Sequence, residues 1–281
     1  MKRVSKWIGA LLIALCLAVV LFPPFFILFS SLLSEWELDF LIHEVGSYAA
    51  GSFLPIRIPP YEVDLHQFRA VLLDRPEILR TLLNTMGYAA ITLAGVFLVA
   101  PLAAFVFAKL RFKGNSVLFF LYVFLLLLPF QVLCVPLYLT VSMLRLMDTP
   151  WAFILPEIFS PLYVFLLRQF MRSIPDSILE AAALDGAGLI RTYLRIILPL
   201  SKPALAVCGV LCAAKCWNMI EQPLLFLKNA SLYPLSLYIH EMMNAGQAEF
   251  LSTCVLAAVP VLLLFLIFND DLMDGLMQME L

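Results

Sequence analysis

Three cysteines share one face of an apolar segment. Cys208, Cys212 and Cys216 are spaced at i, i+4 and i+8, so a helix would place their thiols in one row. Such a row could bind a metal ion or carry a redox couple. None of the six cysteines forms a Cys-x-x-Cys pair, and all lie in apolar stretches, so the sequence predicts no disulfide framework. We favour the interpretation that these small side chains pack where two helices meet.

A basic residue, Lys215, lies in the same apolar segment. A lysine near the middle of a membrane helix costs about 2.5–3.5 kcal/mol on insertion scales, so it should face a partner or a water-filled cavity. Glu221 is close in sequence but lies on another face of the helix. Three interpretations remain: Lys215 contacts a solute crossing the membrane, pairs with another chain, or extends its ammonium to the membrane surface.

The sequence lacks the motifs of common active sites. It has no Gly-x-x-x-x-Gly-Lys-Ser/Thr phosphate loop, no His-Glu-x-x-His and no Gly-x-Ser-x-Gly. The three histidines, His43, His66 and His240, are scattered without ligand spacing, and we interpret them as solvated loop residues. We therefore predict that the chain is not an enzyme and has no catalytic residue, no metal site and no nucleic-acid site.

The composition is that of an integral membrane protein. Of the 281 residues, 63% are hydrophobic and 14% are charged, whereas soluble domains carry about 25% charged residues. A membrane-spanning helix needs about 20 apolar residues, and the apolar stretches predict an all-α polytopic protein that forms a single domain over residues 1–281. The six expected spans cover about 7–33, 82–108, 116–141, 151–170, 203–220 and 251–268.

The distribution of basic residues predicts the orientation. Connectors on the side of the N-terminus hold the larger share, and this side should be cytoplasmic, with both termini on it. The residues on this side are Lys2, Arg3, Lys6, Lys109, Arg111, Lys113, Arg168, Arg172, Arg191, Arg195 and Lys202. Those on the opposite side are Arg57, Arg69, Arg75, Arg80, Arg145 and Lys228.

A polar stretch at about 173–200, between the fourth and fifth expected spans, has the pattern of two short helices. Ser173 or Asp176 can cap the first helix, with Pro175 tolerated in its first turn. Gly186 falls where the helix needs a residue that adopts the left-handed conformation. The second helix places Leu189, Ile190, Tyr193 and Ile197 on one face and Arg191 and Arg195 on the other, and Pro199 and Pro203 close it.

This stretch also carries a long spaced motif. Its parts are Glu180-Ala181-Ala182, Asp185-Gly186-Ala187, Ile197-Leu198-Pro199-Leu200 and Lys202-Pro203-Ala204-Leu205. In residues, spacing and position between two spans, it resembles the cytoplasmic loop of permease subunits of binding-protein-dependent ABC importers. Further segments resemble the sugar-importing subset: Lys109-Leu110-Arg111-Phe112-Lys113-Gly114, Pro136-Leu137-Tyr138-Leu139, Asp148-Thr149, Arg168-Gln169-Phe170, Ser173-Ile174-Pro175, Trp217-Asn218 and Pro223-Leu224.

The resemblance is to the second, maltose-transporter-like permease of such systems, and it implies the MetI-like fold of a type I importer. The polar stretch would be a coupling helix that docks on a separate ATPase subunit. The implied contact residues are Glu180, Ala181, Ala182, Asp185, Gly186 and Ala187. Trp217 and Asn218 would line the substrate pathway with Lys215. The implied partners are a second permease in a heterodimer, two ATPase subunits and an extracytoplasmic binding protein, in the cell membrane of a prokaryote.

The expected function is therefore the import of a sugar or oligosaccharide by alternating access. This chain needs no cofactor of its own, because ATP and Mg²⁺ would bind to the ATPase subunits. One alternative is an importer of the same type for another solute, such as a glycerophosphate. An ion-coupled secondary transporter is a second alternative, but it should carry more ionisable residues within the spans and often a repeated half.

Overall fold

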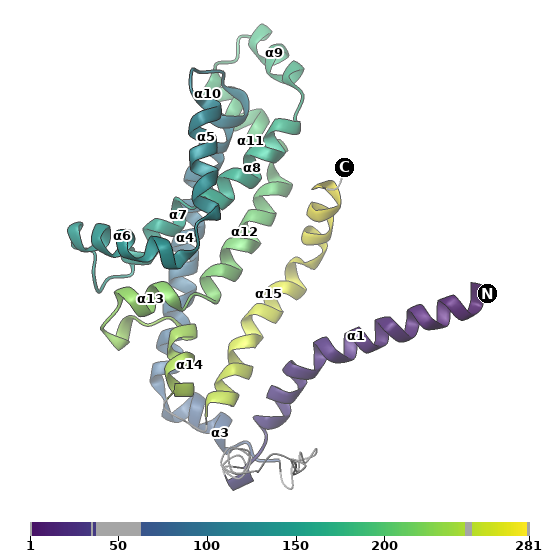
Figure 1. The fold of residues 1–281 in the computed structure, drawn as a ribbon, viewed down its shortest axis with the longest axis vertical. Coiled ribbons are helices and arrows are strands. Elements are labelled where there is room, and N and C mark those ends of the chain that lie inside the picture. Colours follow the sequence, from purple (N-terminus) through teal and green to yellow (C-terminus); the bar gives the residue numbers. More distant parts are fainter. Residues whose placement is uncertain (1, 35, 38–62, 245–248, 280–281) are drawn as a thin grey trace. The chain divides into compact units, whose positions relative to one another are not determined.

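The computed structural model describes all residues except 1, 35, 38–62, 245–248 and 280–281, and the elements it describes are all helices (Figure 1). The chain divides into two compact units. The first comprises Met1–Leu79 and Ile239–Leu262, and the second comprises Arg80–Tyr238 and Leu263–Leu281. The fold agrees with the all-α membrane architecture expected from the composition.

The first unit holds the N-terminal helix and a short turn of helix. α1 spans Lys2–Ser30, and its apolar part, Leu11–Ser30, is long enough to cross a membrane. The turn after α1 is bound to the short helix α3 (His66–Arg69), where the Gln67 side-chain amide donates to the Leu33 carbonyl, 3.1 Å away. A π-helical turn, η1 (Ala70–Asp74), follows α3. Arg75 forms an ion pair of 2.8 Å with Glu249 in the same unit.

The second unit contains most of the remaining helices. Its first helix is α4 (Pro76–Lys109), which enters from the first unit. The others are α5 (Asn115–Phe124), η2 (Leu125–Leu127), α6 (Phe130–Met143), α7 (Trp151–Ile158), α8 (Pro161–Ser173), α9 (Asp176–Leu184), α10 (Leu189–Thr192), η3 (Tyr193–Ile197), α11 (Leu198–Leu200), α12 (Lys202–Trp217), α13 (Glu221–Phe226) and η4 (Ala230–Leu232). α14 (Leu235–Asn244) and α15 (Phe250–Met279) connect the two units along the chain.

The expected spans agree only partly with the helices. Among the described residues, three helices are long and apolar enough to cross a membrane: Leu11–Ser30, Pro76–Lys109 and Trp151–Ser173. They match the first, second and fourth expected spans. The sixth, 251–268, lies within α15, of which Phe250–Leu263 forms a shorter apolar stretch.

The third expected span, 116–141, is not one straight helix. Asn115–Leu127 and Phe130–Met143 differ in direction by 107°. The chain bends at Leu128 and Pro129, both of which have extended backbones. Proline disfavours the helical conformation in the residue before it, and this accounts for the position of the bend. A similar bend of 72° separates Leu189–Leu200 from α12, which ends at Trp217, before the expected boundary at residue 220.

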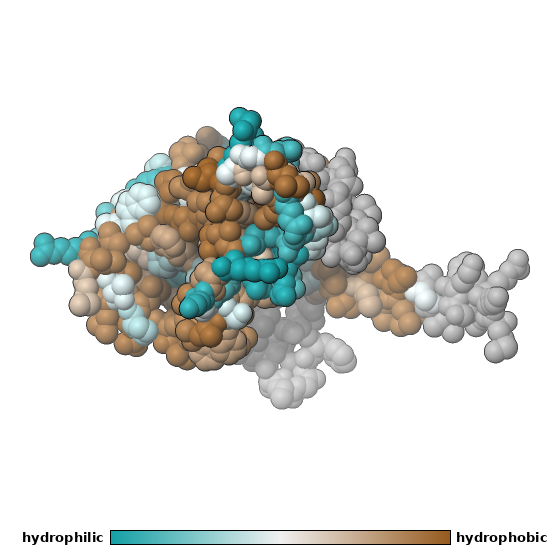
Figure 2. All heavy atoms as spheres, turned by 90° about the horizontal axis from the view of Figure 1, so that it is seen from above, coloured by the Kyte–Doolittle hydropathy of each residue, from teal (hydrophilic) through white to brown (hydrophobic). Residues whose placement is uncertain are grey.

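Two apolar clusters hold the second unit together. The larger joins α4, α8 and α12, and its fully buried members include Val96, Ala100, Leu167, Cys208 and Cys212. The smaller joins α7 with the segment 226–237 and includes Phe153, Ile154, Phe226 and Leu237. Figure 2 shows that apolar side chains also cover much of the visible surface, as expected of a chain that faces lipid or other subunits.

Glycines let α4 approach its neighbours closely. A Cβ added at Gly95 would lie 2.4 Å from Cδ1 of Ile158 on α7, and one added at Gly209 on α12 would lie 2.9 Å from Cζ of Phe97. Small residues have this role at contacts between membrane helices, where close packing replaces the hydrophobic effect as the driving force. α4 is therefore the helix against which both α7 and α12 are positioned.

We expect Gly95→Ala to destabilise the second unit by about 1–3 kcal/mol, because the added methyl group overpacks the contact with Ile158. The thermal unfolding midpoint of the purified protein measures this effect. Adding Ile158→Ala should recover part of the loss, since it removes the atoms that clash. An unchanged midpoint in Gly95→Ala would show that α4 and α7 do not approach this closely.

Candidate functional site

α9 begins later than the capping pattern predicts. The helix starts at Asp176, and Pro175 occupies the N-cap position with an extended backbone and no side-chain hydrogen bond. Ser173, one of the expected caps, instead donates its hydroxyl to the Phe170 carbonyl, 2.7 Å away, at the end of α8. As the first helical residue, Asp176 places its negative charge at the positive end of the helix dipole.

Gly186 ends α9 as predicted. Its φ is +76°, in the left-handed region that favours glycine. The Gly186 amide donates to the Ala183 carbonyl (3.0 Å), and the Ala187 amide donates to the Ala182 carbonyl (2.9 Å). These two bonds define a Schellman motif, which satisfies carbonyls that would otherwise lack partners at the helix end. The turn therefore has a fixed direction.

The residues expected to contact an ATPase subunit differ in exposure. Glu180, Ala181, Asp185 and Gly186 are exposed, and Ala187 is half-buried. Ala182, in contrast, is only 5% exposed. Its side chain packs within this chain, so α9 presents a narrower surface than the alanine run suggested. Leu184, which the motif did not single out, is 89% exposed.

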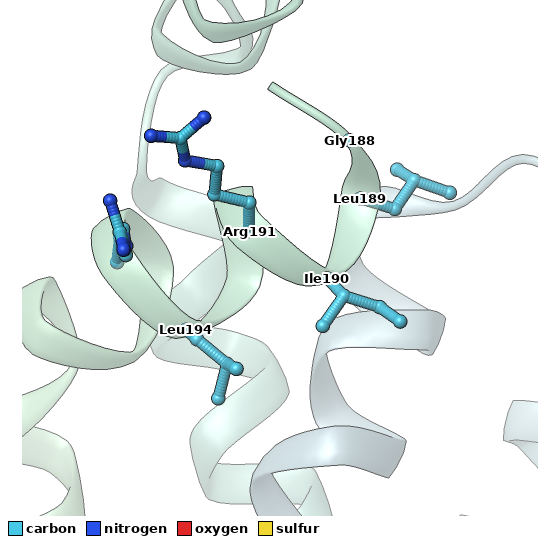
Figure 3. Close-up of a pocket in the computed structure, with 6 residues that line it drawn as sticks. Gly188, Leu189, Ile190, Arg191 and Leu194 are labelled. Atoms are coloured by element: carbon cyan, nitrogen blue, oxygen red, sulfur yellow. The ribbon is translucent and has the colours of Figure 1, made fainter.

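The segment after the turn is apolar on its exposed side. Tyr193 and Ile197 are buried, as the predicted apolar face requires, but Leu189 and Ile190 are 59% and 76% exposed. The first turn of this segment therefore extends beyond the core. It borders an open hollow of about 720 Å³ lined by Gly188, Leu189, Ile190, Arg191, Leu194 and Arg195. In Figure 3, the side chains of Ile190 and Leu194 lie on one side of the helix, and the Arg191 side chain points away from the other side.

A lysine fixes the start of α9 to the end of α4. Lys109 Nζ lies 2.8 Å from Oδ1 of Asp176 and also donates a hydrogen bond to the Ile174 carbonyl. The Lys109 side chain is 2% exposed, whereas that of Asp176 is 63% exposed. The hydrogen bond from Lys109 lowers the pKa of Asp176 below its ordinary value, so this carboxylate is ionised at neutral pH.

A second polar cluster lies among the apolar helices. Lys215 Nζ on α12 lies 2.7 Å from Oε2 of Glu157 on α7, and the Tyr163 hydroxyl on α8 donates to Oε1 of the same carboxylate at 2.6 Å. Glu157 is 2% exposed, while the Lys215 side chain is 46% exposed. Lys215 is in the last turn of α12. Its ionic partner is thus within this chain, and not on another chain as one of the three interpretations had it.

That Glu157 needs a partner could have been predicted from the sequence, although the motifs did not single this residue out. It is a carboxylate inside the apolar stretch 151–170, and charged residues in such stretches need partners. No basic residue follows it at helical spacing, so its pairing with Lys215 depends on the tertiary fold. Tyr163 looks like an ordinary interface aromatic in the sequence, yet it is fully buried.

The other candidate residues have more local roles. The Asn218 side-chain amide donates to the Ala214 carbonyl at 2.8 Å and so binds the end of α12, while Trp217 is half-buried beside it. Cys208, Cys212 and Cys216 are buried in the core as free thiols, as the packing interpretation predicts. Within the described part of the chain, no three His, Cys, Asp or Glu side chains are grouped to hold a metal. His43 lies outside the described residues.

Comparisons with known proteins identify the class. Residues 97–275 match the family described as the binding-protein-dependent transport system inner membrane component. A solved chain from a bacterial ABC transporter involved in the import of the acidic polysaccharide alginate has the same fold, with a TM-score of 0.78 and 21% identity over 95% of this chain and 96% of that one. This chain belongs to the family of binding-protein-dependent transport permeases and is a membrane subunit of such a system.

Two curated relatives are similar over most of their length. The arabinooligosaccharides transport system permease protein AraQ of Halalkalibacterium halodurans is 28% identical over 69% of this chain and 70% of its own length. The sn-glycerol-3-phosphate transport system permease protein UgpE of Yersinia pestis is 31% identical over 71% of this chain and 73% of its own length. Their names describe permeases of transport systems for a saccharide and for a phosphorylated polyol.

We expect Glu157→Leu to destabilise the protein by about 1–3 kcal/mol, because it leaves the Tyr163 hydroxyl and the Lys215 ammonium without their acceptor. Thermal unfolding of the purified protein measures this loss. The double variant with Lys215→Leu removes both charges and should be more stable than Glu157→Leu alone. If the two substitutions were simply additive, the ion pair would contribute nothing to the fold.

Proposed function

We propose that this chain is one of two permease subunits in an ABC importer that takes up a sugar or oligosaccharide. The second permease forms a heterodimer with it, and two ATPase subunits bind ATP and Mg²⁺ on the cytoplasmic side. An extracytoplasmic binding protein delivers the solute. The chain itself has no catalytic role and needs no cofactor.

The observation that carries this proposal is the geometry of α9 and its turn. A short, largely exposed helix ends in a fixed Schellman motif at Gly186, at the position of the family's coupling helix. Glu180, Ala181, Asp185, Gly186 and Ala187 form the contact surface for an ATPase subunit. Ala182 does not belong to this surface but holds it in place, since its side chain is buried and its carbonyl accepts a hydrogen bond from the Ala187 amide.

Transport then proceeds by alternating access. The loaded binding protein docks outside, ATP closes the ATPase dimer, and α9 moves with the ATPase subunit on which it sits. ATP can favour one state of the bundle only through contacts that differ between the states, and the coupling helix is the surface at which such contacts form. The excess of basic residues supports an orientation with α9 and both termini in the cytoplasm.

Two features support a carbohydrate as the solute. One is the similarity to a permease named for arabinooligosaccharides. The other is the Lys215–Glu157 pair, in which the two charges balance, so that the exposed part of Lys215 offers hydrogen-bond donors without a net charge. Lys215, Trp217 and Asn218 line the substrate pathway in this proposal. The similarity to a glycerol-3-phosphate permease favours a phosphorylated polyol as the second candidate.

The test is the ATPase activity of the reconstituted importer with a panel of sugar-loaded and glycerol-3-phosphate-loaded binding proteins. We expect stimulation by a sugar-loaded one. Gly186→Pro should abolish this stimulation without preventing membrane insertion, because proline cannot adopt a φ of +76°. Gly186→Asn, which tolerates the left-handed conformation, is the matched control and should retain it. Normal coupled hydrolysis in Gly186→Pro would contradict the assignment of α9.

Lys215→Met tests the pathway. The substitution removes the ammonium and keeps a long side chain, so sugar uptake by proteoliposomes should fall if Lys215 contacts the solute. Because Glu157 would then carry an unpaired charge, Lys215→Met combined with Glu157→Gln separates lost contact from lost stability. Unchanged uptake and specificity in both variants would remove Lys215 from the pathway.

A further inference from the structure

We infer that α4 is the element that carries movement of the coupling helix across the membrane, with Lys109 as the positioning residue at its inner end and Asn84 at its outer end. This inference rests on the function proposed above and adds the route by which α9 communicates with the outer side. Three observations carry it: a joint at each end of α4 and a tightly packed segment between them.

The inner joint ties three helices to one ammonium group. Lys109 is the last residue of α4, and its Nζ binds the carbonyl of Ile174 at the end of α8 and the carboxylate of Asp176 at the start of α9. A lysine is well placed at a helix C-terminus, and an aspartate is well placed at a helix N-terminus. Because the Lys109 side chain is 2% exposed, water does not compete freely for these bonds.

One face of α9 is also packed against the helices of this unit. Ile178 and Leu179 lie against the apolar cluster that includes α4 and α8, and Ala182 is buried on the same side. The coupling helix is therefore not a free arm on a flexible hinge. A force applied to its exposed face reaches α4 both through the Lys109 joint and through this packing.

The outer joint binds α4 to the segment 231–235. The Asn84 side-chain amide donates to the carbonyls of Ser231 and Tyr233, at 2.9 and 3.1 Å. Thr85, the next residue, accepts at its Oγ1 from the Leu235 amide at 2.7 Å. One turn beyond Asn84, the Tyr88 hydroxyl donates to the Leu232 carbonyl at 3.0 Å. Three side chains of one helix thus hold a short irregular segment on the expected outer side.

Between the two joints α4 is continuous. At 1.5 Å per residue, the helix from Asn84 to Lys109 is about 37 Å long, enough to cross the hydrocarbon core. Pro101 removes one backbone hydrogen bond within it. The residues on either side, Val96, Ala100 and Ala104, are fully buried in the core, so the packing restrains a bend at this point. Rigid, well-packed elements of this kind can couple distant sites.

The experiment uses the complete importer in proteoliposomes and measures ATP hydrolysis with and without the sugar-loaded binding protein. Lys109→Met keeps the length of the side chain and removes its charge. We expect basal hydrolysis to remain and stimulation by the binding protein to fall about fivefold or more, the usual lower range of coupling between sites. Lys109→Arg should restore most of the stimulation, because a guanidinium can bind both oxygen partners.

Lys113→Met is the matched control, since it removes an exposed lysine from the same connector. Asn84→Ala should reduce stimulation as Lys109→Met does. The double variant should lose no more stimulation than the more impaired of the two single variants, because both residues act on one route. Stimulation of Lys109→Met equal to that of Lys113→Met would overturn the inference. If Lys109→Met fails to assemble, the inference is overturned by stimulation in Asn84→Ala that equals that of the wild type. Absence of stimulation in the wild-type importer would instead refute the proposed function.

Discussion

A polar group inside an apolar helix bundle must find its partner within the protein, and the second unit is built around this constraint. Glu157 cannot be solvated at its position, so it accepts from Tyr163 and pairs with Lys215. These three residues come from α7, α8 and α12, and the interaction therefore fixes how three helices meet. It also fixes the break between α7 and α8, because Glu157 and Tyr163 must approach from its two sides. The cysteine row of α12 lies against the same region, where larger side chains would separate the helices.

The same constraint explains why several helices of the second unit pack against α4. Apolar surface gains little by leaving lipid, so contact between membrane helices depends on close packing and on hydrogen bonds. α4 supplies close packing through Gly95, Ala100 and Ala104. It supplies side-chain hydrogen bonds to irregular backbone near its two ends, through Asn84 and Lys109. Its middle is apolar and packed, while Asn84 and Lys109 hold irregular backbone at the two surfaces. Hydrogen bonds are thus placed where the chain leaves regular helix and its backbone needs partners.

Local signals in the sequence were sufficient for the parts of the fold that local chemistry determines. Gly186 could be assigned to the left-handed position because a helix-forming run ends there, and the apolar runs located α1, α4 and the Trp151–Ser173 segment. The bend at Pro129 was missed because apolar composition shows that a stretch can enter a membrane but not that it runs straight. The burial of Ala182 and the Lys215–Glu157 pair depend on helices far apart in the chain. No periodicity within one helix reports such contacts.

The exposed charges of the proposed coupling helix and of the segment after it have an order that a docking partner would have to match. Glu180 on α9 and Asp185 directly after it are exposed, and Arg191 and Arg195 are exposed on the segment that follows the Gly186 turn. Since the Schellman motif fixes the direction of that turn, the two charge groups have a defined arrangement rather than a flexible one. The exposed Leu189 and Ile190 lie between them in the chain and supply apolar contact. A surface that binds both halves therefore needs basic groups facing α9, acidic groups facing the arginines and an apolar patch between. An ATPase subunit that lacked this order would leave exposed charges unpaired, and such mismatches discriminate against wrong partners more strongly than apolar contact alone.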